Sequence, residues 1–168
     1  MPADDWTRTS IETKDRGGAL VTAFNESSKV DAAMQHEQGR TVTETATSAE
    51  DLWKNLEYFL KEVVPVAEEA GVNLALHPDD PPMPMLHGKP QIIWNVEAMA
   101  KAAALVPSER NGLCFCQGTF ASGGVSDMPA AIKSVGKHIK YVHFRDVVGE
   151  VPHFVEVRFQ SLCIAVVS

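Results

Sequence analysis

A short apolar stretch that stops abruptly at a histidine constrains the fold of this chain most. Residues 72–82 read VNLALHPDDPP, so the apolar run ends at His77 and is followed by two acids and a pair of prolines. A strand that presents a histidine at its carboxyl end, with carboxylates beside it, is how a β/α-barrel enzyme presents a metal ligand. The stretch therefore predicts a metal ligand at the end of a barrel strand.

Around this stretch, apolar strands alternate with helices. A serine N-cap, an acid three residues later and a single apolar stripe predict the longest helix, Ser48–Ala70, which Gly71 ends. Strands are predicted at Val72–Leu76, Gly112–Cys116 and Ile139–Phe144, and further helices at Val96–Leu105 and Met128–Val135. This alternation indicates a parallel sheet built from β/α units.

Other segments have less regular patterns. Residues 1–18 are polar and rich in turn residues, so we interpret them as a loop. Apolar residues spaced through residues 19–38 predict a helix or a helix pair. Residues 117–124, QGTFASGG, are predicted to be a glycine-rich loop, and they lack the strand–GxGxxG–helix context of a dinucleotide site.

The spacing of the strands suits a barrel, but the length does not suffice for a complete one. A typical (β/α)8 barrel spends about 250 residues on eight units, roughly 31 per unit, and the strand ends recur at comparable intervals. A chain of 168 residues with three clear strands cannot close eight strands. The expected fold class is therefore α/β, a partial (β/α)8 TIM barrel with parallel strands. We expect one partial domain over residues 1–168, with a divergent tail at 158–168.

Composition excludes several classes of partner. The net charge of −7 and the pI near 5.3 argue against binding to nucleic acid or to an anionic membrane, because either surface needs a basic patch. The chain has no apolar run of about 20 residues and no secretory signal pattern. Three cysteines, Cys114, Cys116 and Cys163, are an odd number that fits a reducing compartment. We expect a cytoplasmic protein with a small-molecule partner.

Three residues at the carboxyl ends of successive strands are candidate metal ligands. They are His77, Cys116 and His143, and regular alternation places His143 on the same face of its strand as Tyr141 and Ile139. Nitrogen and sulfur donors of this kind could converge on one ion. Each residue also has a structural interpretation, since a strand-end histidine is often hydrogen-bonded and a buried cysteine often acts as a small hydrophobe. The residues alone leave both interpretations open.

Several motifs resemble the mannonate dehydratase family, the metal-dependent lyases of hexuronate breakdown. They are LHPDDPP with LHGKPQI, NGLCFCQGTF, IKYVHFRDV with HFVE, and the opening DWTRT, and the resemblance covers residues 5–157. It implies a xylose-isomerase-like (β/α)8 barrel that uses Mn2+ or Fe2+ to dehydrate D-mannonate to 2-keto-3-deoxy-D-gluconate. Matched by position, His77, Cys116 and His143 correspond to metal ligands of the family, whereas Cys114 has no counterpart.

Substrate contacts are expected from a second set of residues. Arg8 and Arg145 are candidates for the substrate carboxylate, because a guanidinium offers a planar fork to it. Both could instead be solvated or ion-paired. Asp79 and Asp80 either orient a ligand histidine, accept substrate hydroxyls or serve the turn before the prolines. His153 is a candidate substrate contact, since it falls near the expected active-site end.

The sequence departs from the family pattern at both ends. The first barrel strands of the family have no counterpart, and no residue after His153 matches the later aspartate, histidine and tyrosine that the resemblance implies. The catalytic acid and base are therefore unassigned and are expected beyond the chain end. Two alternatives stay open: an inactive truncated remnant, and a sugar isomerase or epimerase of the same barrel group. Open sheet edges favour aggregation or pairing with another chain, such as a homo-oligomer.

Overall fold

The computed structural model describes residues 11–14, 20–25, 47–86 and 88–157. Contacts along the chain group it into two compact units, Ala46–Phe144 on the one hand and Met1–Thr45 with Arg145–Ser168 on the other. Two contact units can belong to one domain, so the single domain expected over residues 1–168 stays a prediction. The tail at 158–168 lies outside the described residues.

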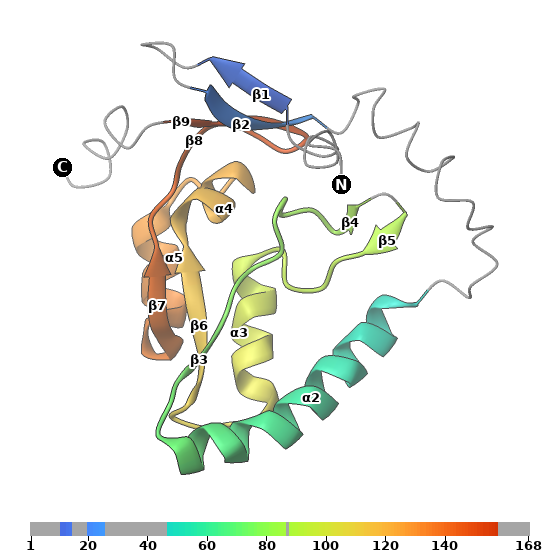
Figure 1. The fold of residues 1–168 in the computed structure, drawn as a ribbon, viewed down its shortest axis with the longest axis vertical. Helices are drawn as coiled ribbons and strands as arrows, with labels where there is room; N and C mark the ends of the chain where they lie inside the picture. The colour runs from blue at the N-terminus through green and yellow to red at the C-terminus, as the bar shows by residue number, and fades with distance from the viewer. Residues whose placement is uncertain (1–10, 15–19, 26–46, 87, 158–168) are drawn as a thin grey trace, which may run out of the picture. The chain divides into compact units, whose positions relative to one another are not determined.

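The unit Ala46–Phe144 is built around a parallel sheet of three strands. These are β3 (Leu74–Leu76), β6 (Asn111–Cys116) and β7 (Ile139–His143), and β6 lies between the other two (Figure 1). Every residue of β6 is buried. The parallel sheet and the strand positions confirm the sequence prediction, with bounds that differ by one or two residues.

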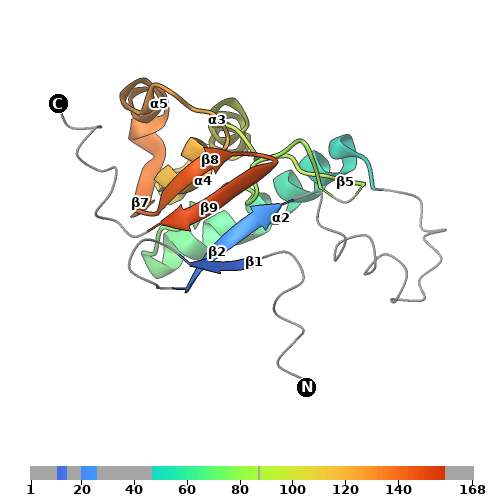
Figure 2. The same ribbon diagram turned by 90° about the horizontal axis from the view of Figure 1, so that it is seen from above.

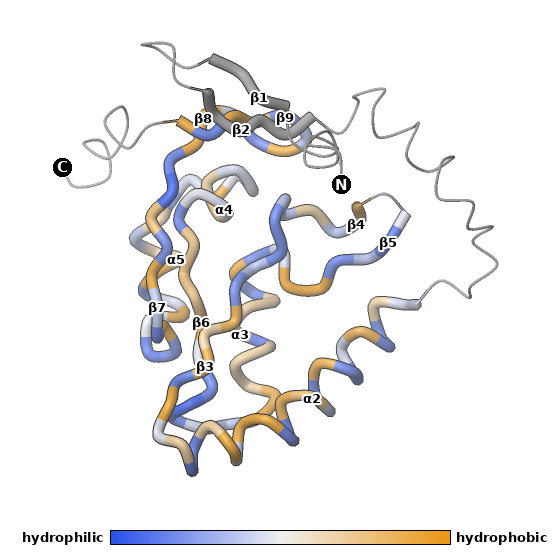
Figure 3. The backbone as a smooth tube through the Cα atoms, in the orientation of Figure 1, coloured by the Kyte–Doolittle hydropathy of each residue, from blue (hydrophilic) through white to orange (hydrophobic). Residues whose placement is uncertain are grey.

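The long helix α2 (Ala49–Ala70) begins and ends where the sequence predicted. Ser48 Oγ accepts a hydrogen bond from the Asp51 amide at 3.0 Å, and the Asp51 carboxylate accepts one from the Ser48 amide, which completes a capping box. Gly71 ends the helix at a φ of 69°, a conformation that costs glycine little. Figure 3 shows hydrophobic and hydrophilic residues alternating along α2, as a helix with one buried stripe requires.

Two shorter helices, α3 (Val96–Leu105) and α5 (Met128–Val135), form the core with β6, and both match the predicted bounds. The side chains of Asn95 and Asp127 cap them by accepting backbone N–H groups three residues on. A 3-10 turn, η2 (Gly136–His138), leads from α5 into β7. The buried cluster comprises Ile93, Met99, Ala102, Ala103, Leu113, Phe115, Phe120, Met128, Ala131 and Val135.

Two segments between the predicted strands and helices contain regular structure that was not predicted from the sequence. The predicted glycine-rich loop is wrong over its first six residues, which form helix α4 (Gln117–Ser122). Phe120 of α4 is buried against Phe115, with ring centroids 4.8 Å apart, so tertiary burial outweighs the low helix propensity of the segment. The proline-rich loop after β3 carries a short hairpin of β4 (Met85–Leu86) and β5 (Lys89–Pro90).

The second unit contains an antiparallel sheet in the order β1-β2-β9-β8 (Figure 2). Its strands are β1 (Ile11–Lys14), β2 (Leu20–Asn25), β8 (Asp146–Glu150) and β9 (His153–Val157). The loop predicted at 1–18 is wrong at β1, and the helix predicted from residue 19 is wrong at β2. The short apolar segment of β2 has an ambiguous period, and its pairing with the distant β9 decides the outcome, while β1 pairs with β2.

None of the helices among the described residues is both long enough and apolar enough to cross a membrane.

Candidate metal centre

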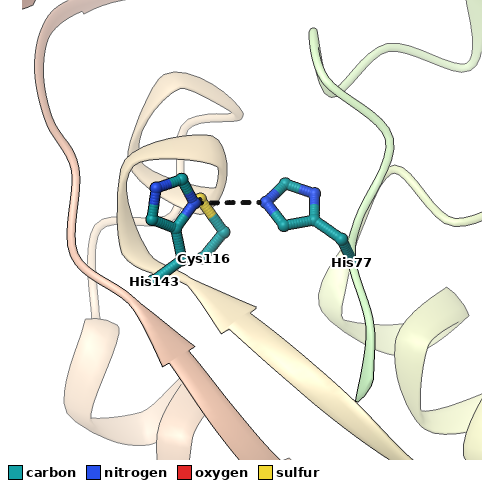
Figure 4. A group of neighbouring side chains, drawn as sticks. All are labelled: His77, Cys116 and His143. Carbon is teal, nitrogen blue, oxygen red and sulfur yellow. Dashed lines mark hydrogen bonds between the residues drawn. The ribbon is translucent and has the colours of Figure 1, made fainter. Parts of the chain in front are cut away.

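The three candidate ligands lie together at the carboxyl ends of the parallel strands. His77 directly follows β3, Cys116 is the last residue of β6, and His143 is the last residue of β7. Figure 4 shows the two imidazole rings and the sulfur pointing toward one another. The parallel pairing explains this arrangement, because the ends of neighbouring parallel strands meet at one edge of the sheet.

The distances between the donor atoms fit a shared cation. His143 Nδ1 lies 3.4 Å from Cys116 Sγ and 3.4 Å from His77 Nε2, and the three donor atoms all lie within 4.8 Å of one another. Nitrogen and sulfur ligands at about 2.0–2.3 Å from one ion are separated from each other by roughly 3–4 Å. The two 3.4 Å separations lie in this range, so small rotations of the side chains would bring the three donor atoms around one ion.

The backbone fixes the tautomer of His77. Its Nδ1 lies 2.7 Å from the carbonyl oxygen of Pro78, and a carbonyl oxygen only accepts hydrogen bonds, so Nδ1 carries the proton and donates it. In a neutral imidazole the other nitrogen, Nε2, then carries a lone pair, and Nε2 is the atom that faces His143. A backbone partner of this kind commonly orients a ligand histidine.

The sulfur and the imidazoles differ in their exposure. Cys116 is completely buried, and its Sγ accepts a hydrogen bond from Thr119 Oγ1 at 3.1 Å. His77 and His143 are exposed. An ion held here would be bound by a buried sulfur on one side and by two exposed imidazoles on the other. Its solvent-facing side would leave room for a further ligand.

Cys114 is also buried, but it does not belong to this group. Burial, with a smaller contribution from the neighbouring Cys116, raises the pKa of its thiol. A thiol that stays protonated is a poor metal ligand, so its environment supports the packing role predicted from the sequence.

Regular alternation placed His143 on the same face as Ile139, and this expectation is wrong. Ile139 packs against the helix-covered core, whereas His143 reaches Cys116 on the opposite face. A register shift between β6 and β7 lies between the two positions.

The described residues predicted to contact substrate have partners of their own in the structure. Asp79 Oδ2 accepts a hydrogen bond from the Ile93 amide at 2.8 Å, so its carboxylate fastens the loop after β3. Arg145 forms an ion pair with Glu156 at 3.3 Å in the second unit, where His153 begins β9. Arg8 lies outside the described residues. The roles of these residues in substrate binding stay predictions.

Two partners of the candidate ligands were not identified from the sequence. The Thr119 hydroxyl contacts Cys116 only because residues 117–122 form a helix, and the Pro78 carbonyl acts through its backbone. A Cys-x-x-Thr spacing across a strand end and the first helical turn would have been the signal for Thr119.

The sequence of this chain matches one family of known proteins. The sequence model of the family described as D-mannonate dehydratase (UxuA) matches residues 1–164. The chain is 35% identical over 163 residues to a mannonate dehydratase of Oceanobacillus iheyensis, covering 88% of this chain and 46% of that protein. Over 98 residues it is 42% identical to a mannonate dehydratase of Enterococcus faecalis, covering 58% of this chain and 27% of that protein.

A solved structure has a similar fold. The crystal structure of mannonate dehydratase from Streptococcus suis serotype 2 superposes with a TM-score of 0.71 at 36% identity, covering 94% of this chain and 45% of that one. The chain spans about half the length of the curated relatives that it matches. Since the family model matches nearly all of the sequence, and the structural neighbour carries the same name, the chain belongs to the D-mannonate dehydratase family.

Proposed function

We propose that this chain serves the dehydration of D-mannonate to 2-keto-3-deoxy-D-gluconate, with a divalent ion held by His77, Cys116 and His143. The convergence of three donor atoms within 4.8 Å, in a chain of this family, is the observation that carries the proposal. The reaction is a hydro-lyase reaction, in which C2 loses a proton and C3 loses its hydroxyl as water.

The three donor atoms favour one of the two ions expected for the family. Imidazole nitrogen and thiolate sulfur suit Fe2+ better than Mn2+, whose preferred ligands are carboxylate, carbonyl and water oxygens. Of the two ions expected for the family, Fe2+ therefore fits His77, Cys116 and His143 better. An oxygen-donating substrate in the remaining coordination positions would make Mn2+ more acceptable.

The chemistry explains why such a site would need a metal. The proton alpha to a carboxylate is weakly acidic, because its removal adds negative charge beside an existing one. A bound divalent ion supplies Lewis-acid stabilisation of that charge. The described residues would hold the ion in one place, because the Pro78 carbonyl orients His77 and the Thr119 hydroxyl orients the sulfur of Cys116.

The substrate carboxylate would be bound by arginine in this proposal. Arg145 forms an ion pair with the Glu156 carboxylate, and Arg145 and Arg8 are the two candidates for the substrate carboxylate. Asp79 acts indirectly, because its hydrogen bond to Ile93 holds the loop that follows His77. His153 remains a proposed substrate contact.

The test is an assay of the purified 168-residue chain with D-mannonate, after loading with Fe2+ or Mn2+ under anaerobic conditions. A 2-keto-3-deoxy product that Cys116→Ala abolishes and that the matched control Cys114→Ala retains would support the proposal. Product formation that survives Cys116→Ala undiminished would refute the ligand assignment. Metal binding without any product would favour a non-catalytic metal-binding chain instead.

The parallel order β3-β6-β7 and the superposition on a mannonate dehydratase support the further proposal that these strands are part of a (β/α)8 barrel. Exposed apolar side chains on β7, such as Tyr141 at 60%, support pairing with a second copy of the chain. Sedimentation velocity would measure the oligomeric state. The acidic composition argues against nucleic-acid and anionic-membrane partners, and the odd number of cysteines supports a reducing, cytoplasmic location.

A further inference from the structure

Strand β7 carries one extra residue beside β6. Leu113 of β6 pairs with Ile139, but the next residue, Cys114, pairs with Tyr141, so Lys140 has no partner of its own on β6. One additional residue on one strand, with a local disruption of the ladder, defines a β-bulge. Bulges change the direction in which the following side chains point.

The bulge decides which face His143 occupies. Residues four positions apart in a regular strand share a face, so Ile139 and His143 would point the same way without it. Ile139 instead packs with the helix-covered core, while His143 Nδ1 lies 3.4 Å from Cys116 Sγ on the other side of the sheet. The extra residue therefore turns His143 out of the core and toward the metal group.

Gly112 provides the space that the bulge occupies. A Cβ atom on Gly112 would overlap Cγ of Lys140 and would lie 2.7 Å from the carbonyl oxygen of His138. The second contact is with backbone, so a side-chain rotation cannot relieve it. Lys140 extends past Gly112 and places its Nζ 3.7 Å from Glu109 Oε2, with only 19% of its side chain exposed.

We propose that Gly112 and the bulge at Lys140 position His143 as a metal ligand. This inference rests on the metal site proposed above, and Gly112 and Lys140 are positioning residues that do not touch the ion. Any side chain at position 112 would press on the bulge, and the displacement would reach His143 three residues further along β7. His77 follows a different strand, β3, and Cys116 lies on β6 four residues beyond Gly112, so neither of them follows the bulge along β7.

The experiment measures Co2+ binding by the full 168-residue chain, followed by the visible and near-ultraviolet absorption of the ion. Gly112→Ala is expected to weaken Co2+ binding by at least about 10-fold, as the loss of an orienting partner does. At saturating Co2+ the thiolate-to-cobalt band should persist, because Cys116 remains, while the ligand-field bands change as one imidazole is lost. Circular dichroism monitors the fold.

Gly136→Ala is the matched control. Gly136 has a φ of −53° and a ψ of −40°, and a Cβ there meets no described atom within 4 Å. This variant should bind Co2+ as the unchanged chain does.

A double-mutant cycle separates positioning from general damage. If Gly112 acts through His143, then Gly112→Ala has little further effect on Co2+ affinity in a His143→Ala background. An equal loss of affinity in both backgrounds would overturn the inference. If Gly112→Ala does not fold, deletion of Lys140 replaces it in the cycle. The deletion removes the extra residue without adding atoms beside β6.

The results distinguish this inference from the proposed function. If the unchanged chain binds no Co2+, the metal site fails and the positioning role fails with it. If the unchanged chain binds Co2+ and Gly112→Ala binds it equally well, the metal site stands and only the positioning role is refuted.

Discussion

The two faces of β6 are buried to the same degree but have different neighbours. Phe115 is 3% exposed and packs among the helices, whereas the next residue, Cys116, is 0% exposed and points toward His143. On the helix-covered face, the neighbours are apolar side chains that complement Phe115 in shape. On the opposite face, the neighbours of Cys116 are a hydroxyl and an imidazole.

This difference shows that burial alone does not separate a core residue from a ligand. Replacing a core residue leaves a cavity and lowers the free energy of unfolding. Replacing a ligand removes a donor atom and lowers metal affinity. Variants on the two faces should therefore separate stability from binding, and the following predictions run from the largest effect to the smallest.

Phe115→Ala should lower the free energy of unfolding by about 3–5 kcal/mol, because it empties a site in the helix-covered core and loses the contact with Phe120. Urea denaturation measures the change. Phe59→Ala is the control, since Phe59 is 55% exposed on α2 and should cost much less. Equal losses for the two variants would show that the face containing Phe115 is not a packed core.

Cys116→Ala should weaken the binding of Fe2+ or Co2+ by more than about 100-fold, because it removes a ligand atom. Loss of a partner that only orients a ligand typically weakens metal affinity by roughly 10- to 100-fold. The unfolding midpoint without metal should change far less than for Phe115→Ala, because a small side chain is removed. Titration followed by absorption measures the affinity. Cys114→Ala, two residues earlier in the same strand, should keep the affinity of the unchanged chain, and a comparable loss there would contradict the assignment.

Thr119→Val should weaken metal affinity by roughly 10- to 100-fold, because it removes the hydroxyl that donates to Cys116 Sγ at 3.1 Å. Ser122→Ala is a matched control in the same helix. The Ser122 hydroxyl is equally buried but donates to the Thr119 carbonyl instead of the sulfur, so its loss should alter stability without altering affinity. The same titration followed by absorption measures both variants.

The smallest predicted effect concerns His138, at the opposite, amino-terminal end of β7. Burial, with the nearby Lys137 and Lys140, lowers the pKa of its imidazole from the ordinary 6.5. As the pH falls, His138 therefore takes up its proton at a higher pH in the unfolded chain than in the folded chain. The contribution of neutral His138 to the free energy of unfolding is present above pH 6.5 and is lost as the pH falls through the folded pKa.

His138→Gln should remove that part of the pH dependence. Urea midpoints measured between pH 7.5 and pH 5 would show a shallower decline for the variant than for the unchanged chain. Parallel curves for the two proteins would mean that His138 titrates alike in both states.

The sequence predicted the helices and the central strands well where the signals are local. The capping box of Ser48 and Asp51 and the left-handed Gly71 define the ends of α2 through contacts within a few residues. The same holds for α3 and α5, each of which has a side-chain cap at its start. Helix α4 was not predicted, because its stability depends on the burial of Phe120 against a strand that the sequence does not place beside it.

The antiparallel sheet was missed for a related reason. Residues 23–25 of β2 pair with β9, which lies more than a hundred residues away in the sequence, and a short apolar segment gives no reliable period by itself. For the candidate site, the residue types and their recurrence at strand ends predicted His77, Cys116 and His143, and the structure brings their donor atoms together.

The sequence by itself determined which residues of this protein can act as metal donors and which local segments form helices, because both depend on residue identity and on short-range spacing. Only the tertiary structure decided that His143 faces Cys116. That outcome depends on one extra residue in β7 and on the missing side chain of Gly112 in the neighbouring strand. A bulge arises from the pairing of two strands, so the alternation within either strand alone cannot reveal it.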